Sequence, residues 1–207
     1  MRYCTEKGRK CYELLAIADH AEPCAQFCGR IAGQKPLYLL RAAARGEGQE
    51  GLARLFEQTA ENEKIHAEEF WELLTKHGGK TIENIDLEAG YPFSFGNTGE
   101  NLQFAAEGEQ AEHERVYPAF AQTAEEEGYA DAARLWRMIA SIEGQHHAAF
   151  LRAREEYLSG MRWRRDEPAA WHCLNCGYTY TSQEAAEYCP VCGKGKGWMA
   201  AGTPGSD

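Results

Sequence analysis

The sequence predicts an all-α four-helix bundle followed by a small C-terminal module. Apolar residues recur at helical spacing in long stretches, two of these stretches repeat each other, and four cysteines fall in two pairs near the C-terminus. We therefore assign residues 1–165 to the bundle and residues 166–207 to the module, with the boundary at Asp166-Glu167-Pro168.

Composition excludes several classes of protein. The 207 residues are 43% hydrophobic and 26% charged, which is typical of a globular protein rather than of a disordered chain. A formal net charge of −10 repels phosphate backbones, so we expect no nucleic-acid partner. No apolar run approaches the ~20 residues of a membrane span, and residues 1–10 lack a signal-peptide pattern. We expect a cytoplasmic protein with no membrane partner.

Helical periodicity and its interruptions place the bundle helices. The pattern predicts helices, in chain order, somewhere within 10–46 and over Gly48–His77, Asn101–Glu127 and Tyr129–Ser159. The first helix is the hardest to place, because Pro23, Gly33 and Pro36 interrupt its stretch. The linker 81–99 is too long for a tight hairpin, so we expect it to cross over along the bundle.

An internal repeat relates two helix pairs. Ala53-Arg54-Leu55-Phe56 lies 80 residues before Ala133-Arg134-Leu135-Trp136. The same offset relates further identical residues, which are the pairs Gly48/Gly128, Ala60/Ala140, Glu63/Glu143, His66/His146 and Phe70/Phe150. The repeat indicates that one helix pair was duplicated to build the bundle.

Each copy of the repeat carries a Glu-x-x-His motif. Glu63 and His66 form the first motif, and Glu143 and His146 form the second. Three residues are close to one helical turn, so each pair projects from one face of its helix. Burying both groups is costly without a partner, and a shared metal satisfies both. His20, His77, His113 and His172 fit no comparable pattern, and we expect them to be exposed or to cap helices.

The third helix adds carboxylates at the same spacing. Glu109 and Glu112 are three residues apart, and Tyr117 follows as a candidate hydrogen-bond donor to the site. Mixed carboxylate and imidazole ligands favour iron or manganese over a closed zinc site. We expect two irons bridged by Glu63 and Glu143.

The C-terminal cysteines form two CxxC pairs. Cys173 and Cys176 are followed by Gly177, and the second pair, Cys189 and Cys192, is followed by Gly193. Two such turns place four thiolates tetrahedrally around one metal. The spacing suits either a zinc ribbon or a one-iron site, and the neighbouring di-iron motif favours iron, which has a purpose in electron transfer.

Taken together, these motifs resemble the rubrerythrin family over about residues 47–199. The resemblance is carried by the paired Glu-x-x-His helices, by Glu109, Glu112 and Tyr117-Pro118 on the third helix, and by Cys189-Pro-Val-Cys192-Gly. It implies a ferritin-like bundle and a C-terminal rubredoxin-like β module that binds iron. It also implies a peroxidase that reduces hydrogen peroxide to water in oxidative-stress defence.

The resemblance also implies roles and partners. Glu63 and Glu143 bridge the irons, His66 and His146 are terminal ligands, and Glu109 and Glu112 complete the di-iron set. The family pattern gives the single iron four cysteine ligands, Cys173, Cys176, Cys189 and Cys192. Glu63, Glu112, Glu143 and Tyr117 are the expected catalytic residues. The expected partners are hydrogen peroxide, a redox donor such as rubredoxin or an NAD(P)H-dependent reductase, and a second copy in a head-to-tail homodimer.

One stretch departs from the family pattern. Arg30 occupies the place of a first-helix ligand glutamate, and an arginine does not bind iron. Either Glu13 or Glu22 takes over as ligand, with Glu13 preferred because Pro23 follows Glu22, or one iron lacks a ligand. The same stretch holds four further cysteines, Cys4, Cys11, Cys24 and Cys28. Their side chains either are buried as small hydrophobic groups or form a thiol pair or an extra metal site.

Two other functions remain open at the level of sequence. A ferritin-like bundle of this kind also suits an iron-oxidising, iron-handling protein. Alternatively, the cysteine module is a zinc ribbon in an interaction protein with a degenerate bundle, for which Arg30 is the best argument.

Overall fold

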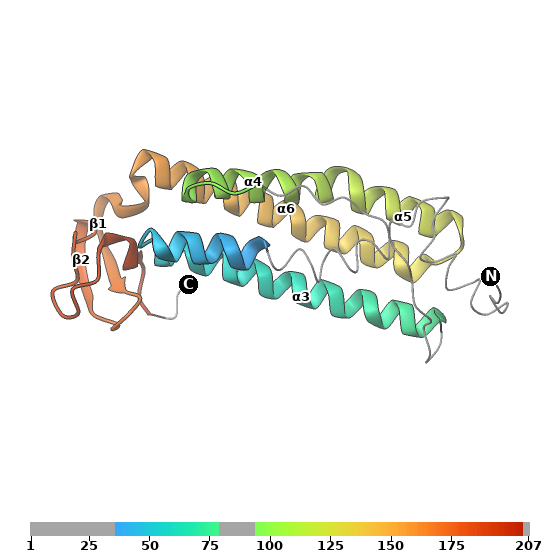
Figure 1. The fold of residues 1–207 in the computed structure, drawn as a ribbon, viewed down its shortest axis with the longest axis horizontal. Helices are drawn as coiled ribbons and strands as arrows, with labels where there is room; N and C mark the ends of the chain where they lie inside the picture. The colour runs from blue at the N-terminus through green and yellow to red at the C-terminus, as the bar shows by residue number, and fades with distance from the viewer. Residues whose placement is uncertain (1–35, 79–93, 205–207) are drawn as a thin grey trace. The chain divides into compact units, whose positions relative to one another are not determined.

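The computed structural model describes residues 36–78 and 94–204 (Figure 1). Residues 36–46 are helical, and they are followed by α3 (Glu50–Gly78), α4 (Thr98–Ala111), the π-helical turn η1 (Glu112–Val116), α5 (Tyr117–Glu126) and α6 (Ala130–Ser159). The C-terminal elements are η2 (Met161–Trp163), β1 (Arg164–Cys173), β2 (Thr179–Glu184), η3 (Lys196–Trp198) and β3 (Met199–Ala201). The predicted fold class, a ferritin-like helical bundle with a small β module, is confirmed. Within the described ranges no helix is long and apolar enough to cross a membrane.

The chain divides into two compact units. Of the described residues, unit 1 contains 59–78 and 107–147, and unit 2 contains 37–58, 94–106 and 148–204. The C-terminal sheet therefore belongs to the same unit as the first turns of α3. Strand β1 begins at Arg164, so the boundary that we predict at residue 166 falls inside it.

The internal repeat is visible as two matching turns between helices. Gly48 and Gly128 both have positive φ angles, 78° and 86°, which favour glycine. Gln49 N–H donates to Ala44 O at 2.8 Å, and at the same offset Tyr129 N–H donates to Ala124 O at 2.7 Å. These are the backbone bonds of a helix C-cap that leads directly into the next helix.

Apolar faces of the helices form the core of each unit. In unit 1, Trp136 of α6 packs on Phe70 of α3 and on Tyr117 of α5, with ring centroids 4.4 Å and 5.5 Å apart. In unit 2, Phe56 of α3 packs on Phe150 of α6 at 5.4 Å, and both are fully buried. Burial of these aromatic side chains stabilises the helices more than helix propensity does.

The start of α4 differs slightly from the prediction. It begins at Thr98 rather than at Asn101 because Asn97 caps it: Asn97 Oδ1 accepts the Glu100 N–H at 3.1 Å, and Glu100 returns a bond to the Asn97 N–H at 2.9 Å. The Glu47 carboxylate accepts the Thr98 N–H at 3.1 Å. The cap lies in the sequence as Asn-x-x-Glu, and periodicity alone did not reveal it.

A π-helical turn interrupts the helix predicted over Asn101–Glu127. Residues Glu112–Val116 form this turn, and α5 starts immediately afterwards with Pro118 in its first turn. Proline lacks an N–H and its ring clashes with the carbonyl four residues earlier, so a regular α-helix through this point is unfavourable. The wider turn relieves that clash, and it falls on the segment that carries Glu112.

The C-terminal sheet of unit 2 has the strand order β2-β1-β3, with both pairs antiparallel. Trp171 is fully buried under it with Cys173, Cys189 and Met199. The expectation for His172 is wrong: it is 3% exposed, with Nδ1 3.0 Å from Gly202 O. It lies at the end of β1, where three consecutive residues, 171–173, are buried within unit 2.

Candidate metal centres

Five predicted ligands of the helical site lie together in unit 1. All five are buried, and they come from three helices: Glu63 and His66 of α3, Glu109 of α4, and Glu143 and His146 of α6. Donor atoms of Glu63, Glu109, Glu143 and His146 all lie within 4.8 Å of one another. A group this close, buried and rich in oxygen donors is suited to a metal rather than to a hydrogen-bonded core.

His66 borders this group. Its Nδ1 is 3.3 Å from Glu143 Oε1 and 3.5 Å from Glu63 Oε1, and its ring lies 6.1 Å from that of His146. The Glu-x-x-His spacing thus brings both motifs to one place, as helical geometry predicts.

The donor chemistry of this site fits bound iron. Three buried carboxylates lie together, and in the part of the chain that the structure describes neither His66 Nδ1 nor Glu109 Oε2 makes a hydrogen bond. Burial raises the pKa of Glu109 to about 8, opposed by the nearby His146 ring and reinforced by the charge of Glu143. Burial alone would lower the pKa of His146, but Glu109 and Glu143 raise it to about 9. Cations bound here would offset the repulsion between carboxylates.

Asn62 contacts the outer nitrogen of His146. Its amide nitrogen lies 3.1 Å from His146 Nε2, while His146 Nδ1 faces Glu143 Oε2 at 2.9 Å. A histidine that binds metal through one nitrogen donates the N–H of the other, so the Asn62 amide would present its oxygen to Nε2 in the metal-bound state. The sequence prediction missed Asn62. The internal repeat contained a clue: the residue before the ligand glutamate is polar in the first copy, Asn62, and apolar in the second, Ile142.

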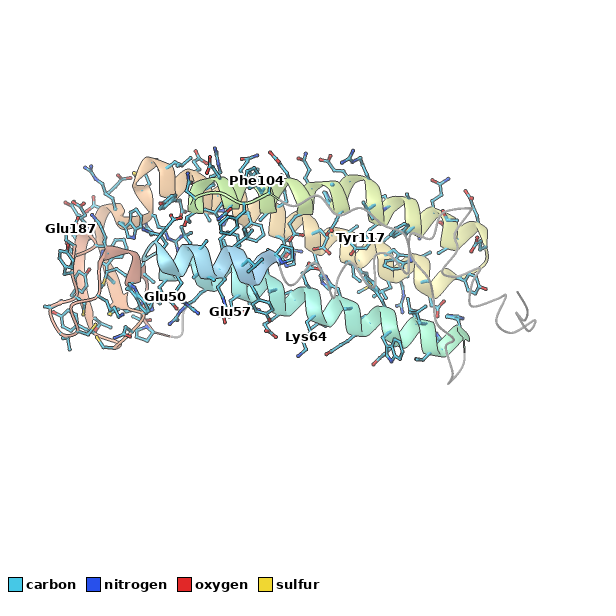
Figure 2. All side chains as sticks on the ribbon, in the orientation of Figure 1. Glu50, Glu57, Lys64, Phe104, Tyr117 and Glu187 are labelled. Atoms are coloured by element: carbon cyan, nitrogen blue, oxygen red, sulfur yellow. The ribbon has the colours of Figure 1, made fainter. Side chains whose placement is uncertain are left out.

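Glu112 and Tyr117 occupy different surroundings. Glu112 is half-buried on η1 and is not part of the compact group, although its charge contributes to the raised pKa of Glu109. Tyr117, labelled in Figure 2, is fully buried and stacks on Trp136. Their assigned roles remain predictions. Arg30, Glu13, Glu22 and the cysteines Cys4, Cys11, Cys24 and Cys28 lie outside the described residues.

The four predicted cysteine ligands converge in unit 2. Their sulfurs all lie within 4.8 Å of one another, with Cys173 3.6 Å from Cys192 and Cys176 3.6 Å from Cys189. None of these four is in a disulfide. A tetrahedron of metal–sulfur bonds of about 2.3 Å requires sulfurs about 3.8 Å apart, so the cluster matches a four-thiolate metal site.

Backbone turns orient donors toward these sulfurs. Gly177 N–H donates to Cys173 O, and Gly193 N–H donates to Cys189 O, each at 2.9 Å, which closes the two turns. Both glycines have positive φ angles, 77° and 71°. The Lys194 N–H lowers the pKa of the Cys192 thiol to about 6, which favours the thiolate form that binds metal.

Comparison with known proteins gives a consistent result. Residues 35–154 match a family model described as Rubrerythrin, and residues 171–198 match one described as the rubredoxin-like domain of rubrerythrin. The chain is 39% identical over 167 residues to rubrerythrin of Porphyromonas gingivalis, covering 80% of each protein. It is 36% identical to rubrerythrin of Clostridium perfringens, covering 80% of this chain and 85% of that one.

A solved structure of similar fold is that of nigerythrin in a partially reduced state. It superposes with a TM-score of 0.57 at 27% sequence identity, covering 93% of this chain and 86% of that one. The ranges matched by the two family models, 35–154 and 171–198, include every described residue of both candidate metal centres.

Proposed function

Because the chain belongs to the rubrerythrin family, we propose that it is a non-haem di-iron peroxidase that reduces hydrogen peroxide to water. Family membership makes it an iron-based oxidoreductase of oxidative-stress defence, with a di-iron centre and a rubredoxin-type iron as cofactors. The observation that carries the peroxidase proposal is the buried group of three carboxylates and two imidazoles, which suits a pair of redox-active cations.

The overall reaction takes one hydrogen peroxide, two protons and two electrons to two waters. Iron held at the helical site would supply the redox chemistry of this reaction, the electrons needed for O–O cleavage. In our proposal Glu63 and Glu143 would be the ligands shared by the two irons, and His66 and His146 would be the terminal ligands. Glu109 would be the fifth buried ligand of this site.

Other side chains of unit 1 prepare the site for this reaction. We assign a part in excluding bulk water to the buried core of Phe70, Tyr117 and Trp136, in which Phe70 follows His66 by about one helical turn. We assign proton delivery to Glu112, because this half-buried carboxylate has access to solvent and its charge acts on Glu109. Tyr117 is assigned to orient groups at the site through its hydroxyl.

Electrons enter through the cysteine module in this proposal. The donor is a redox protein such as rubredoxin or an NAD(P)H-dependent reductase in the cytoplasm, and the protein acts as a homodimer in which each module serves the partner's di-iron site. Light scattering combined with single-turnover kinetics tests the assembly. A monomer with full electron transfer between its two sites would contradict the dimer.

The peroxidase activity is tested by single-turnover oxidation. Protein reduced anaerobically and mixed with peroxide should regain the visible bands of its ferric four-cysteine iron within one turnover. Glu143→Ala should abolish this return, whereas Glu155→Ala, an exposed change on the same helix, should not. If Glu143→Ala keeps the wild-type rate, the helical group is not the site of reduction. Iron uptake well beyond the two sites, without peroxide turnover, would instead favour an iron-handling protein.

A further inference from the structure

Helix α3 contacts the first cysteine turn directly within unit 2. The Nη2 of Arg54 donates a hydrogen bond of 2.8 Å to the carbonyl oxygen of Leu174, which lies between Cys173 and Cys176. The Leu174 N–H donates to Trp198 O at 2.8 Å, so both backbone polar groups of this residue are fixed. Arg54 thereby holds one peptide of the metal-binding turn in place.

Two glycines show how closely this part of unit 2 is packed. A Cβ at Gly51 of α3 would lie 2.7 Å from Nη2 of Arg162 and 3.7 Å from Cδ1 of Leu174. A Cβ at Gly197 would overlap the carbonyl oxygen of Gly48. The module therefore packs on the first turns of its own α3, and the Arg54 contact lies at the exposed edge of this packed interface.

The peptide that Arg54 holds also faces a metal ligand. Burial is the largest influence on the pKa of the Cys173 thiol and raises it, whereas the backbone N–H groups of Cys176 and Asn175, which act on the sulfur, lower it. A trans peptide is planar, and its C=O and N–H point in opposite directions. Arg54 and the Cys173 sulfur therefore sit at the two ends of one peptide dipole. A cation at the oxygen polarises the peptide and strengthens the N–H···S bond at its other end.

We propose that Arg54 is a positioning residue that raises the reduction potential of the iron in the cysteine module by holding and polarising the Leu174–Asn175 peptide. The proposal relies on iron at the four cysteines. Reduction adds one electron to ferric iron, and the four-thiolate site goes from one net negative charge to two without change in its ligands. Hydrogen bonds to sulfur and nearby positive charge stabilise the more negative ferrous form.

The neighbouring acidic residues do not cancel the positive charge near the Leu174–Asn175 peptide. Glu50, labelled in Figure 2, lies 3.4 Å from Nε of Arg54 but is held mainly by Arg45, through bonds of 2.8 and 3.0 Å. Glu57 pairs with both Arg41 and Arg45 in the same cluster. Two carboxylates therefore face three guanidinium groups, those of Arg41, Arg45 and Arg54, so the local balance is positive. The Arg54 side chain is 48% exposed, so its charge is partly screened by solvent and salt.

The internal repeat supplies a matched control. Arg134 is the repeat partner of Arg54 and is also exposed, but it belongs to unit 1, outside the unit that holds the cysteine turns. Arg134→Gln removes the same charge from the equivalent helix position. It leaves the contact to Leu174 untouched.

The test is a spectroelectrochemical titration of the iron-loaded full chain, followed through the ferric charge-transfer bands. Arg54→Gln should shift the ferric/ferrous equilibrium about three- to tenfold toward ferric iron, which is about 30–60 mV for one electron. Arg54→Lys, which keeps the charge, should retain most of the wild-type potential, and Arg134→Gln should match wild type. The Arg54→Gln difference should shrink in about 1 M salt.

A second readout is independent of iron chemistry. In zinc-loaded protein the amide proton of Asn175 should move upfield in Arg54→Gln, because a weaker N–H···S bond deshields it less. Unchanged thermal melting confirms that the variant is folded. The proposal is overturned if Arg54→Gln leaves both the potential and the amide shift at wild-type values. It is also overturned if Arg54→Lys and Arg54→Gln lower the potential equally, which would indicate loss of packing rather than of charge, or if Arg134→Gln reproduces the shift.

Discussion

The helical site and the cysteine site differ in the size of the hydrophobic core that supports them. The helical site draws its donors from α3, α4 and α6, and the large aromatic core of unit 1 joins α3 and α6 to α5. The four cysteines come from two short turns, and the core beneath them is small, built around Trp171 and Met199. A large core forms without metal, whereas a module this small depends on its metal to fold. The two sites should therefore respond differently when their metals are removed.

The largest expected effect is on the cysteine module. Cys189→Ser removes a buried thiolate from a site of the type that contributes on the order of 10 kcal/mol to the folding of small domains. We expect the visible bands and the ordered amide signals of the β strands to disappear, while the helical circular dichroism remains. A module that keeps its native amide signals without metal would contradict the comparison.

A smaller structural effect is expected at the helical site. Glu143→Ala should reduce iron affinity there by more than the roughly 10- to 100-fold that outer-shell changes cost, because a shared ligand is lost. The metal-free variant should melt at or above the temperature of metal-free wild type, since one of three clustered buried carboxylates is gone. Iron content and calorimetry measure the two effects. A collapse of helical structure would show that this metal, too, is needed for folding.

The outer contact to His146 provides a finer test. Asn62→Ile places the residue of the repeat partner, Ile142, opposite His146 and removes the amide that holds its ring. We expect metal affinity of the helical site to fall about 10- to 100-fold with little change in melting. Asn62→Asp, which offers an oxygen acceptor, should restore most of the affinity. Equal losses in both variants would indicate that the ring orientation is set elsewhere.

The smallest expected effect comes from an ion pair of unit 1 that is remote in sequence from both ligand sets. Lys76 and His77 hold the Asp131 carboxylate, and the bond from Lys76 is the main cause that lowers the pKa of Asp131. A group whose folded-state pKa is depressed stabilises the fold in full above its unfolded pKa of about 4, and this contribution is lost progressively as pH falls from there through the lower folded-state pKa. Asp131→Asn should therefore cost about 0.5–1 kcal/mol at pH 7 and less near pH 3.

Denaturant unfolding at the two pH values measures this difference. At pH 7 the iron content of the variant should equal that of wild type. A loss of iron would mean that the stability of the helices and the binding of their metal are coupled, contrary to the independence that we infer from the large core of unit 1.

Features that the sequence predicted are local in the chain, and features that it missed are not. The Glu-x-x-His motifs and the CxxC turns are local patterns, so helical spacing and turn chemistry revealed them, and the repeat related Gly48 to Gly128 correctly. The contacts of Asn62 with His146 and of Arg54 with Leu174 join residues far apart in the chain. They depend on how packed elements meet, which no local pattern encodes. The π-turn at Glu112 required weighing Pro118 against a continuous helix.

Metal content tests the central claim, that one chain holds two different iron sites, most directly. Protein made in iron-replete medium should contain about three irons per chain, two in the helices and one at the cysteines, with the visible colour of ferric iron bound by four thiolates. Glu143→Ala should lose helical iron and keep the colour, whereas Cys189→Ser should lose the colour and keep helical iron. Colourless protein with one zinc per chain and no iron would contradict the account.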